Sequence, residues 1–263
     1  MKTTILPLLE EMMPITLEEM NSIHLMDRVD SKFVAPAAIL PLLFKEMTPF
    51  FKVQVNDAGK RIAPYTTQYL DTSQLDMFVM HQNGKLNRQK IRIRTYQDVD
   101  VSFLEVKNKN NKGRTKKIRV STDRSHIETM ADLEDKHPFL IENSLFDIRE
   151  LTPSLANEFN RITLVNNRKT ERITIDLSLT FHNYRTQEHR LMDDLVILEL
   201  KQDGWQRSDF LNILAKLRIK RSAFSKYCMG MIATDPNVKY NRFKTRWALI
   251  KKKNQLIYNY NFQ

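Results

Sequence analysis

Glycine is scarce in this chain. Only 5 of its 263 residues are glycine, and no two of them lie within ten positions of each other. A Walker A loop and a dinucleotide-binding fingerprint both need clustered glycines, because their backbone amides must approach phosphate closely. Both kinds of nucleotide site are therefore excluded, and any phosphate must be bound by side chains.

Cysteine and long apolar runs are also nearly missing. The single Cys228 excludes a disulfide framework and a cysteine-rich zinc site, and it suits a reducing compartment. The longest apolar candidate, residues 33–43, contains two prolines and is shorter than the roughly 20 residues of a membrane-spanning helix. The apolar run at residues 5–9 ends at two glutamates and does not resemble an export signal. We expect a cytoplasmic protein without a transmembrane segment.

The positive charge is distributed unevenly. The chain has 42 Lys and Arg against 31 Asp and Glu, a net charge of +11, which favours polyanionic partners but does not indicate a fold. Residues 85–119 hold 12 basic and 3 acidic side chains, and residues 236–263 hold 7 basic and no acidic ones. The remainder is slightly acidic. The two basic segments therefore need separate explanations.

The central basic segment alternates strictly over residues 90–96, which read KIRIRTY. A period of two predicts a β-strand with Arg92 and Arg94 on one face and the isoleucines on the other. Charged and aliphatic residues alternate similarly in five further segments. These are residues 28–33, 103–109, 117–120, 172–176 and 197–201.

A charged face of this kind has two interpretations. One wet face is ordinary in an antiparallel sheet, but such faces usually mix Thr, Ser, Glu and Lys, whereas these hold mainly Arg and Lys. If the sheet closes into a barrel, the interior is too crowded with like charge to be stable without a bound polyanion. The repeated pattern favours this cationic tunnel.

Helices are expected between the strands, where they would cover the outer apolar face of an antiparallel α+β domain. We take residues 1–235 as this domain and residues 236–263 as a basic aromatic tail or helix. The predicted helices are residues 37–47, 73–83, 128–135, 154–165, a segment capped by Ser208, and residues 222–233.

The C-terminal segment combines basic residues with aromatic ones such as Tyr240, Phe243 and Trp247. One interpretation is a solvated helix with an apolar stripe packed on the body. The other is contact with an anionic partner, including a membrane surface or a membrane-protein partner through which the chain becomes membrane-associated. Nucleic acid is not the expected partner, because the basic charge outside this segment alternates with apolar residues as in an enclosed site.

Seven motifs, in order along the chain, together resemble the VTC domain, the polyphosphate polymerase branch of the CYTH-like triphosphate tunnel metalloenzymes. The resemblance covers about residues 25–230 and implies a closed eight-stranded antiparallel β-barrel tunnel with helices packed outside. It also implies ATP and polyphosphate as partners and a divalent metal, Mn²⁺ or Mg²⁺, as cofactor. The motifs are RVDSKF at 28–33, YLDT at 69–72, IRIR at 91–94, LEVK at 104–107, RITID at 172–176, LELK at 198–201 and FSKY at 224–227.

The resemblance also implies roles for individual residues. Glu199 matches the carboxylate that holds the metal, with Glu105 as a second candidate and Asp176 as an alternative helper. Arg92, Arg94 and the helix residue Lys226 are the residues expected to be catalytic. Phosphate binding is expected from Lys32, Arg92, Arg94, Lys107, Arg119, Arg161, Arg172, Lys201, Lys220 and Lys226.

Two departures from the related patterns matter. The phosphatase and cyclase branch begins with a Glu-x-Glu-x-Lys strand, where this chain has Arg28 and Asp30, which favours the polymerase. The polymerase pattern has a basic residue three positions before Lys226, where this chain has Ala223 and only Lys220 or Arg221 as substitutes. The alternatives are a hydrolase of tripolyphosphate or a nucleoside triphosphate, and a non-enzymatic polyanion-binding module.

Overall fold

The computed structural model describes residues 2–21, 28–112, 114–204 and 207–255. Its main element is a sheet in which eight strands follow the order β2-β11-β9-β8-β4-β5-β6-β7, every neighbouring pair being antiparallel. The strands are β1 (Pro14–Ile15), β2 (Arg28–Pro36), β3 (Phe51–Gln54), β4 (Ala63–Thr72), β5 (Arg88–Tyr96), β6 (Val101–Lys109), β7 (Thr115–Thr122), β8 (Leu151–Asn166), β9 (Glu171–Asn183), β10 (His189–Met192) and β11 (Leu195–Asp203).

Helices surround this sheet, so the predicted antiparallel α+β class is confirmed. The α-helices are α1 (Lys2–Glu10), α2 (Leu17–Asn21), α3 (Leu40–Met47), α4 (Asp76–Gln82), α5 (His137–Asn143), α6 (Asp209–Lys216), α7 (Lys226–Thr234) and α8 (Lys244–Gln255). The 3₁₀ helices are η1 (Ala37–Ile39), η2 (Met130–Lys136), η3 (Ile148–Glu150) and η4 (Asn241–Phe243).

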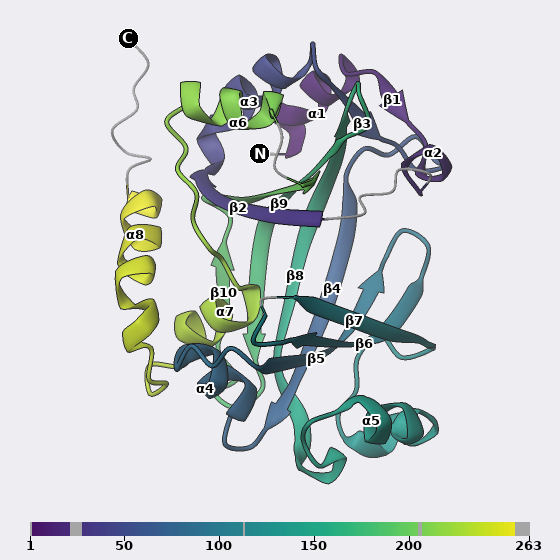
Figure 1. Cartoon of the computed structure of the whole chain (residues 1–263), viewed down its shortest axis with the longest axis vertical. Coiled ribbons are helices and arrows are strands. Elements are labelled where there is room, and N and C mark those ends of the chain that lie inside the picture. Colours follow the sequence, from purple (N-terminus) through teal and green to yellow (C-terminus); the bar gives the residue numbers. More distant parts are fainter. Residues whose placement is uncertain (1, 22–27, 113, 205–206, 256–263) are drawn as a thin grey trace.

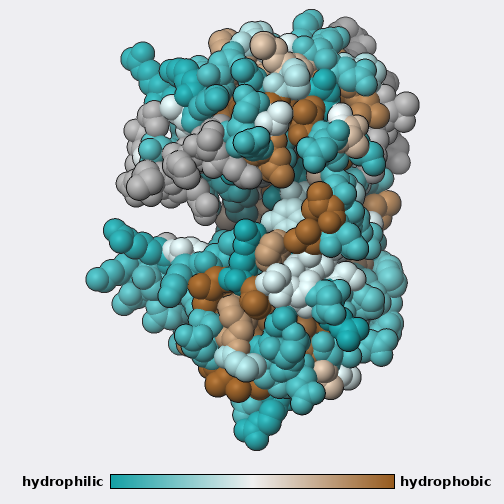
Figure 2. Space-filling model, turned by 90° about the vertical axis from the view of Figure 1, so that its right-hand side faces the viewer, coloured by the Kyte–Doolittle hydropathy of each residue, from teal (hydrophilic) through white to brown (hydrophobic). Residues whose placement is uncertain are grey.

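The sheet is strongly curved. The long strands β4, β8 and β9 run behind, while β2 and the β5–β6–β7 group cross in front of them at opposite ends (Figure 1). The side view shows the molecule hollowed between these two ends (Figure 2). We call this hollow the cleft, and the concave side of the sheet that lines it the inner face.

The expected closure of the sheet into a barrel is not confirmed. In the part of the chain that the structure describes, no pairing joins β2 to β7, the two ends of the strand order. The free edge of β2 instead meets the segment before α7, where Ser222 N donates to Lys32 O at 2.8 Å and Arg221 bridges Phe33. These contacts involve residues 32 and 33 of β2, and β7 lies at the opposite end of the cleft (Figure 1).

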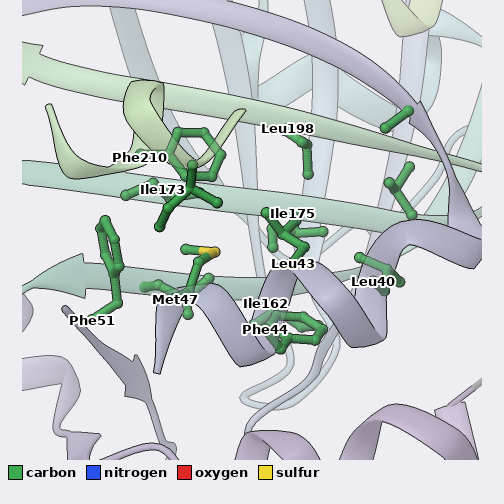
Figure 3. Close-up of a cluster of buried hydrophobic side chains, with 14 of the residues drawn as sticks. Leu40, Leu43, Phe44, Met47, Phe51, Ile162, Ile173, Ile175, Leu198 and Phe210 are labelled. Atoms are coloured by element: carbon green, nitrogen blue, oxygen red, sulfur yellow. The ribbon is translucent and has the colours of Figure 1, made fainter. Parts of the chain in front are cut away.

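The outer face of the sheet is apolar and covered by helices. At the β2 end, Leu40, Leu43 and Phe44 of α3 pack with Phe210 of α6 and with strand residues such as Ile175 (Figure 3). At the other end, β5 and β6 contribute isoleucines, Leu104 and Val106 to a second cluster with Leu133 and Leu140. The aliphatic side of the alternating strands therefore packs against the helices on the outer face, which leaves the charged side for the inner face.

The inner face is closed at one end by α7. Tyr227 and Met231 of this helix pack on Leu155 and Phe181 of β8 and β9. Gly230 makes this possible, because a Cβ there would lie 2.5 Å from both strand side chains. The helix places the side chain of Lys226, its first residue, against the charged part of the inner face.

One predicted helix is wrong. Residues 154–165 belong to strand β8, which pairs with β4 on one side and β9 on the other. Leu155, Phe159 and Ile162 are spaced as on a helix face, but Leu155 and Phe159 belong to the cluster around α7, whereas Ile162 belongs to the cluster around α3 on the opposite face of the sheet. Because the strand contributes apolar side chains first to one face and then to the other, its apolar spacing imitates a helical period.

The other helical segments are confirmed, with shifted ends. The segment predicted at 128–135 is the 3₁₀ helix η2, which begins with a capping box formed by Thr129 and Asp132. Ser208 caps α6 by accepting from Leu211 N, and Ser225 caps α7 by accepting from Cys228 N. Within the described residues, no helix is both long and apolar enough to cross a bilayer.

The C-terminal segment packs on the body as far as the structure describes it. Phe243 and Ile250 are buried in the cluster around α7, and Trp247 packs against the same cluster. This matches the interpretation as a helix with an apolar stripe, while its division from residues 1–235 as a separate unit stays a prediction. The aromatic residues at 258, 260 and 262 lie outside the described residues.

Candidate functional site

The charged residues of the predicted strands share the inner face because of strand register. Arg92 lies opposite Glu105, Glu199 lies opposite Lys32, and Arg161 lies opposite Asp176. Directly paired residues in a sheet point to the same side. The inner face therefore carries Lys32 of β2, Lys90, Arg92 and Arg94 of β5, Glu105 and Lys107 of β6, Lys117 and Arg119 of β7, Arg161 of β8, Arg172 and Asp176 of β9, and Glu199 and Lys201 of β11.

Glu105 is the centre of the first ion-pair group. Arg92 donates from Nε and Nη2 to Glu105 Oε2 at 2.8 and 2.6 Å, and Lys117 Nζ donates to Oε1 at 3.1 Å. Burial alone would raise the pKa of Glu105, but Arg92, Arg94 and Lys117 outweigh it and lower the pKa to about 2. This carboxylate is ionised, and both of its oxygens are already bonded.

Asp176 is the centre of a second group, in the middle of the sheet. Arg161 donates from Nε and Nη2 to the two carboxylate oxygens at 2.7 and 2.9 Å, and Lys226 also bonds Asp176. The Lys226 ammonium lies 3.8 Å from the centre of the Phe159 ring. Burial tends to raise the pKa of Asp176, but the two cations lower it, so the carboxylate is ionised. Burial lowers the pKa of Lys226, although Asp176 opposes that shift.

Glu199 is held more loosely. Its carboxylate lies 3.3 Å from Lys32 Nζ and 3.9 Å from Lys201 Nζ, distances longer than those of the other two groups. Burial tends to raise its pKa, but Lys201, Lys32 and Arg161 outweigh burial and lower it. Of these three carboxylates, Glu199 therefore has the oxygens most open to a further ligand.

Lys90, Arg94 and Lys107 form no ion pair with a carboxylate of the described residues. The Nε atom of Arg94 is buried and has no hydrogen-bond partner. Burial and the charges of Lys32, Arg92 and Arg88 lower the pKa of Lys90 to about 8, and its ammonium donates to Ser225 Oγ at 2.8 Å. The surrounding protein and the neighbouring cations likewise lower the pKa of Lys107 to about 8. Since buried cations are normally paired, this arrangement fits an anionic ligand.

The carboxylates of the inner face differ in their suitability for a divalent ion. Among the residues that the structure describes, no three His, Cys, Asp or Glu side chains gather into a metal cage. Mg²⁺ and similar hard ions, however, usually bind through one or two carboxylates together with substrate phosphates. Glu199 fits this role better than Glu105, because Arg92 and Lys117 occupy both oxygens of Glu105.

The remaining predicted site residues differ in position. Arg119 is exposed, with its guanidinium 4.2 Å from the centre of the Phe103 ring. Arg172 donates from Nη2 to Met20 O at 2.5 Å. Lys220 is exposed beside the free edge of β2, and no contact within the described residues links it to Lys226. The roles of all predicted site residues stay predictions.

Three inner-face residues were absent from the predicted site or had only a minor place in it. Lys90 and Lys117 were not selected, although each is in phase with the selected arginines of its strand. Asp176 had been considered only as a helper for the metal, whereas it bonds both Arg161 and Lys226. The alternation of residues 90–96 already indicated Lys90, but the partners of Asp176 depend on long-range contacts.

The comparison with known proteins decides the family. Residues 27–234 match the family model of the VTC domain. The chain belongs to the VTC domain family. The resemblance indicated by the seven motifs is thereby confirmed, over nearly the same residues. The sequence matches no curated protein.

Solved structures share the fold of this VTC domain. A candidate adenylyl cyclase from Hippeastrum, described as having a dominant triphosphatase activity, aligns with a TM-score of 0.50 at 16% identity, covering 79% of this chain and 96% of that one. A candidate adenylate cyclase from Bacillus halodurans aligns with a TM-score of 0.48 at 12% identity, covering 76% and 96%. At these identities the likeness concerns the fold alone.

Proposed function

We propose that this VTC domain is an ATP-dependent polyphosphate polymerase that transfers the γ-phosphoryl group of ATP to a growing polyphosphate chain in the cleft. The observation that carries the proposal is the convergence of Arg and Lys side chains from seven strands and α7 on one inner face. Such a face matches a substrate with one negative charge or more on each phosphate. Phosphoryl transfer depends mainly on alignment and charge neutralisation of this kind.

Arginines with free donors suit phosphate particularly well. A guanidinium can bond two phosphate oxygens at once, and each charge-assisted hydrogen bond contributes about 1.5–3 kcal/mol. Arg94 has a buried donor without a partner, whereas Arg92 and Arg161 are held in place by Glu105 and Asp176. We infer that Arg94 contacts the transferred phosphoryl group and that the paired arginines are rigid neighbours.

The reaction needs no nucleophile from the protein. A terminal oxygen of the polyphosphate chain forms a bond to the γ-phosphorus of ATP, the bond from that phosphorus to the β–γ bridging oxygen breaks, and ADP leaves. The acceptor oxygen is already anionic, so no protein base must remove a proton. Cys228 is buried and its pKa is raised, mainly by burial, so it does not offer a thiolate.

A divalent ion would be held by Glu199 together with phosphate oxygens. When bound, Mn²⁺ or Mg²⁺ would supply charge neutralisation and polarise the transferred group. Lys32 and Lys201 keep Glu199 ionised in the absence of the ion and orient its carboxylate. Residues 28 and 30 of the first strand, Arg and Asp, lack the glutamate pair of the phosphatase and cyclase pattern, which supports polymerase over hydrolase.

The test is to incubate the purified full chain with ATP and Mn²⁺ and to resolve the products on a gel. Long polyphosphate together with ADP is the expected result. Release of orthophosphate without polymer would instead support a hydrolase, an activity described for the Hippeastrum structure. Absence of any turnover would support a non-enzymatic polyanion-binding module.

A matched pair of variants separates site from scaffold. Arg94→Met should abolish turnover without lowering the melting temperature, because the buried Nε atom of Arg94 has no bond to lose. Arg149→Met is the control, since Arg149 is exposed and pairs with the nearby Asp147. Full turnover in the Arg94 variant would contradict the assignment of the cleft as the active site.

A further inference from the structure

Basic side chains continue beyond the ion-paired part of the inner face. Between Arg92 and the edge formed by the start of β5 and the end of β6, all charged inner-face residues are Lys or Arg. The C-terminal segment adds two arginines beside α4. We call this set the basic track. It consists of Lys85, Arg88, Lys90, Lys107, Lys109, Arg242 and Arg246.

The members of the basic track are neighbours in space. Arg88 lies opposite Lys109 in the β5–β6 ladder, and its Nη1 donates to Lys85 O at 2.9 Å. Arg242 Nη1 donates to Asn83 O at 3.1 Å. The guanidinium of Arg242 lies against Gly84, where a Cβ would be 2.4 Å from Arg242 Cζ. A larger residue at position 84 would therefore displace the Arg242 side chain. The turn after α4 thus holds Arg242 beside the start of β5.

Electrostatic interactions connect the same residues. His81 lies beneath them with its ring 5.5 Å from that of Phe243. Burial and the charges of Lys90, Arg88, Arg246 and Lys109 lower the pKa of His81 to about 2, so the imidazole is neutral and adds no charge. Arg242 also lowers the pKa of Arg88, after burial. The cations are therefore close enough to repel one another.

The basic track differs from the rest of the cleft because its cations are not paired with carboxylates of the described residues. Glu105, Asp176 and Glu199 each pair with two cations. Across residues 2–21, 28–112, 114–204 and 207–255, no ion pair with a carboxylate is formed by any member of the track. Clustered like charge destabilises a fold unless an anion neutralises it. Carboxylates suit a metal-bound triphosphate, whereas cations alone suit a polyanion without metal.

We propose that linear polyphosphate leaves the cleft along the basic track, over α4 and the start of α8, as a chain free of divalent metal. This inference rests on the proposed function. The growing end of the polyphosphate lies in the part of the cleft that contains carboxylates, and the completed part of the polyphosphate lies along the basic track. Arg242 and Arg246 lie beyond residues 27–234, so this part of the track is outside the segment shared with the family model. The packed C-terminal helix thereby becomes part of the product path.

The test compares short and long polyphosphate in the absence of metal. The affinities of the full chain for tripolyphosphate and for a polyphosphate of about 60 phosphates are measured over a range of salt concentrations. The double variant Arg242→Gln, Arg246→Gln removes two charges from the far end of the track. The control, Lys45→Gln with Lys60→Gln, removes two exposed charges elsewhere and leaves the same net charge. Melting curves establish that both variants fold.

The double variant should bind long polyphosphate at least about tenfold more weakly, with a salt dependence reduced by about one to two released ions. Its affinity for tripolyphosphate should stay within about twofold, and the control should behave as the natural chain. Unchanged binding of the long chain would overturn the proposed path, as would an equal loss for both ligands. If the natural chain binds no tripolyphosphate, the proposed function fails, yet selective loss of long-chain binding would still support the track.

Discussion

Lys90 allows a quantitative test through pH. Its pKa is lowered to about 8 by burial and by neighbouring cations, so about 90% of the free protein carries the ammonium at about pH 7 and about 10% at about pH 9. A bound polyanion favours the ammonium form and raises this pKa. Binding therefore takes up a proton, and the affinity for a polyphosphate should fall as the pH rises through about 8.

The size of the effect follows from the two protonation fractions. If the ligand requires a charged Lys90, the affinity decreases by about tenfold between about pH 7 and about pH 9. Lys90→Met should lose this component while retaining the stem of the side chain. Lys45→Met, an exposed change on α3, should keep the pH dependence of the natural chain. The ionisation of tripolyphosphate itself is common to all three proteins and cancels in the comparison.

The assay is isothermal titration with tripolyphosphate at several pH values, in two buffers that differ in heat of ionisation. At about pH 8, Lys90 should account for the uptake of about half a proton, which is missing in the Lys90→Met protein. Equal pH dependence of the natural chain and this variant would show that protonation of Lys90 is not linked to binding. Either Lys90 would then not face the ligand, or its pKa would not be lowered in the free protein.

Three further predictions concern carboxylates. Asp176→Ala leaves two buried cations unpaired and should lower the free energy of unfolding in urea by about 3–5 kcal/mol. Asp147→Ala, at an exposed pair, should cost far less, and equal losses would contradict the role of burial. Glu199→Gln should reduce metal-dependent turnover by about a hundredfold or more without weakening the binding of tripolyphosphate in the absence of metal. Retained turnover would contradict the assignment of Glu199 as the metal ligand. Tyr227→Phe removes the hydroxyl that donates to the Asp71 carboxylate at 2.5 Å. Chemical denaturation should show that the free energy of unfolding falls by about 1.5–3 kcal/mol. An unchanged denaturation midpoint would mean that this hydrogen bond does not stabilise the fold.

Much of the inner face could be predicted from the sequence because strand alternation is a local property. Arg92 and Arg94 share a face wherever strand β5 lies, and the isoleucines between them must then be buried on the other side. Strand β8 shows where this reasoning fails. Its apolar residues belong to two clusters on opposite faces of the sheet, which gives them a helical spacing, and the correct state depends on pairing with β4 and β9.

The pairing of charges could not be predicted in the same way. Arg92 and Lys90 are two positions apart in one strand, yet Arg92 bonds Glu105 while Lys90 bonds a serine that caps α7. That difference comes from the register of β6 and from the position of a helix more than 130 residues later in the chain. Local periodicity contains no information on either.

The amino-acid sequence already indicates that side chains must bind the phosphate, since five scattered glycines cannot form a phosphate loop. It also shows that the basic residues alternate with apolar ones. The tertiary fold leaves the sheet open, since no pairing within the described residues joins β2 to β7. It also decided which cations stay without acidic partners. Faces depend on spacing along one strand, whereas closure and pairing depend on contacts between segments far apart in the chain.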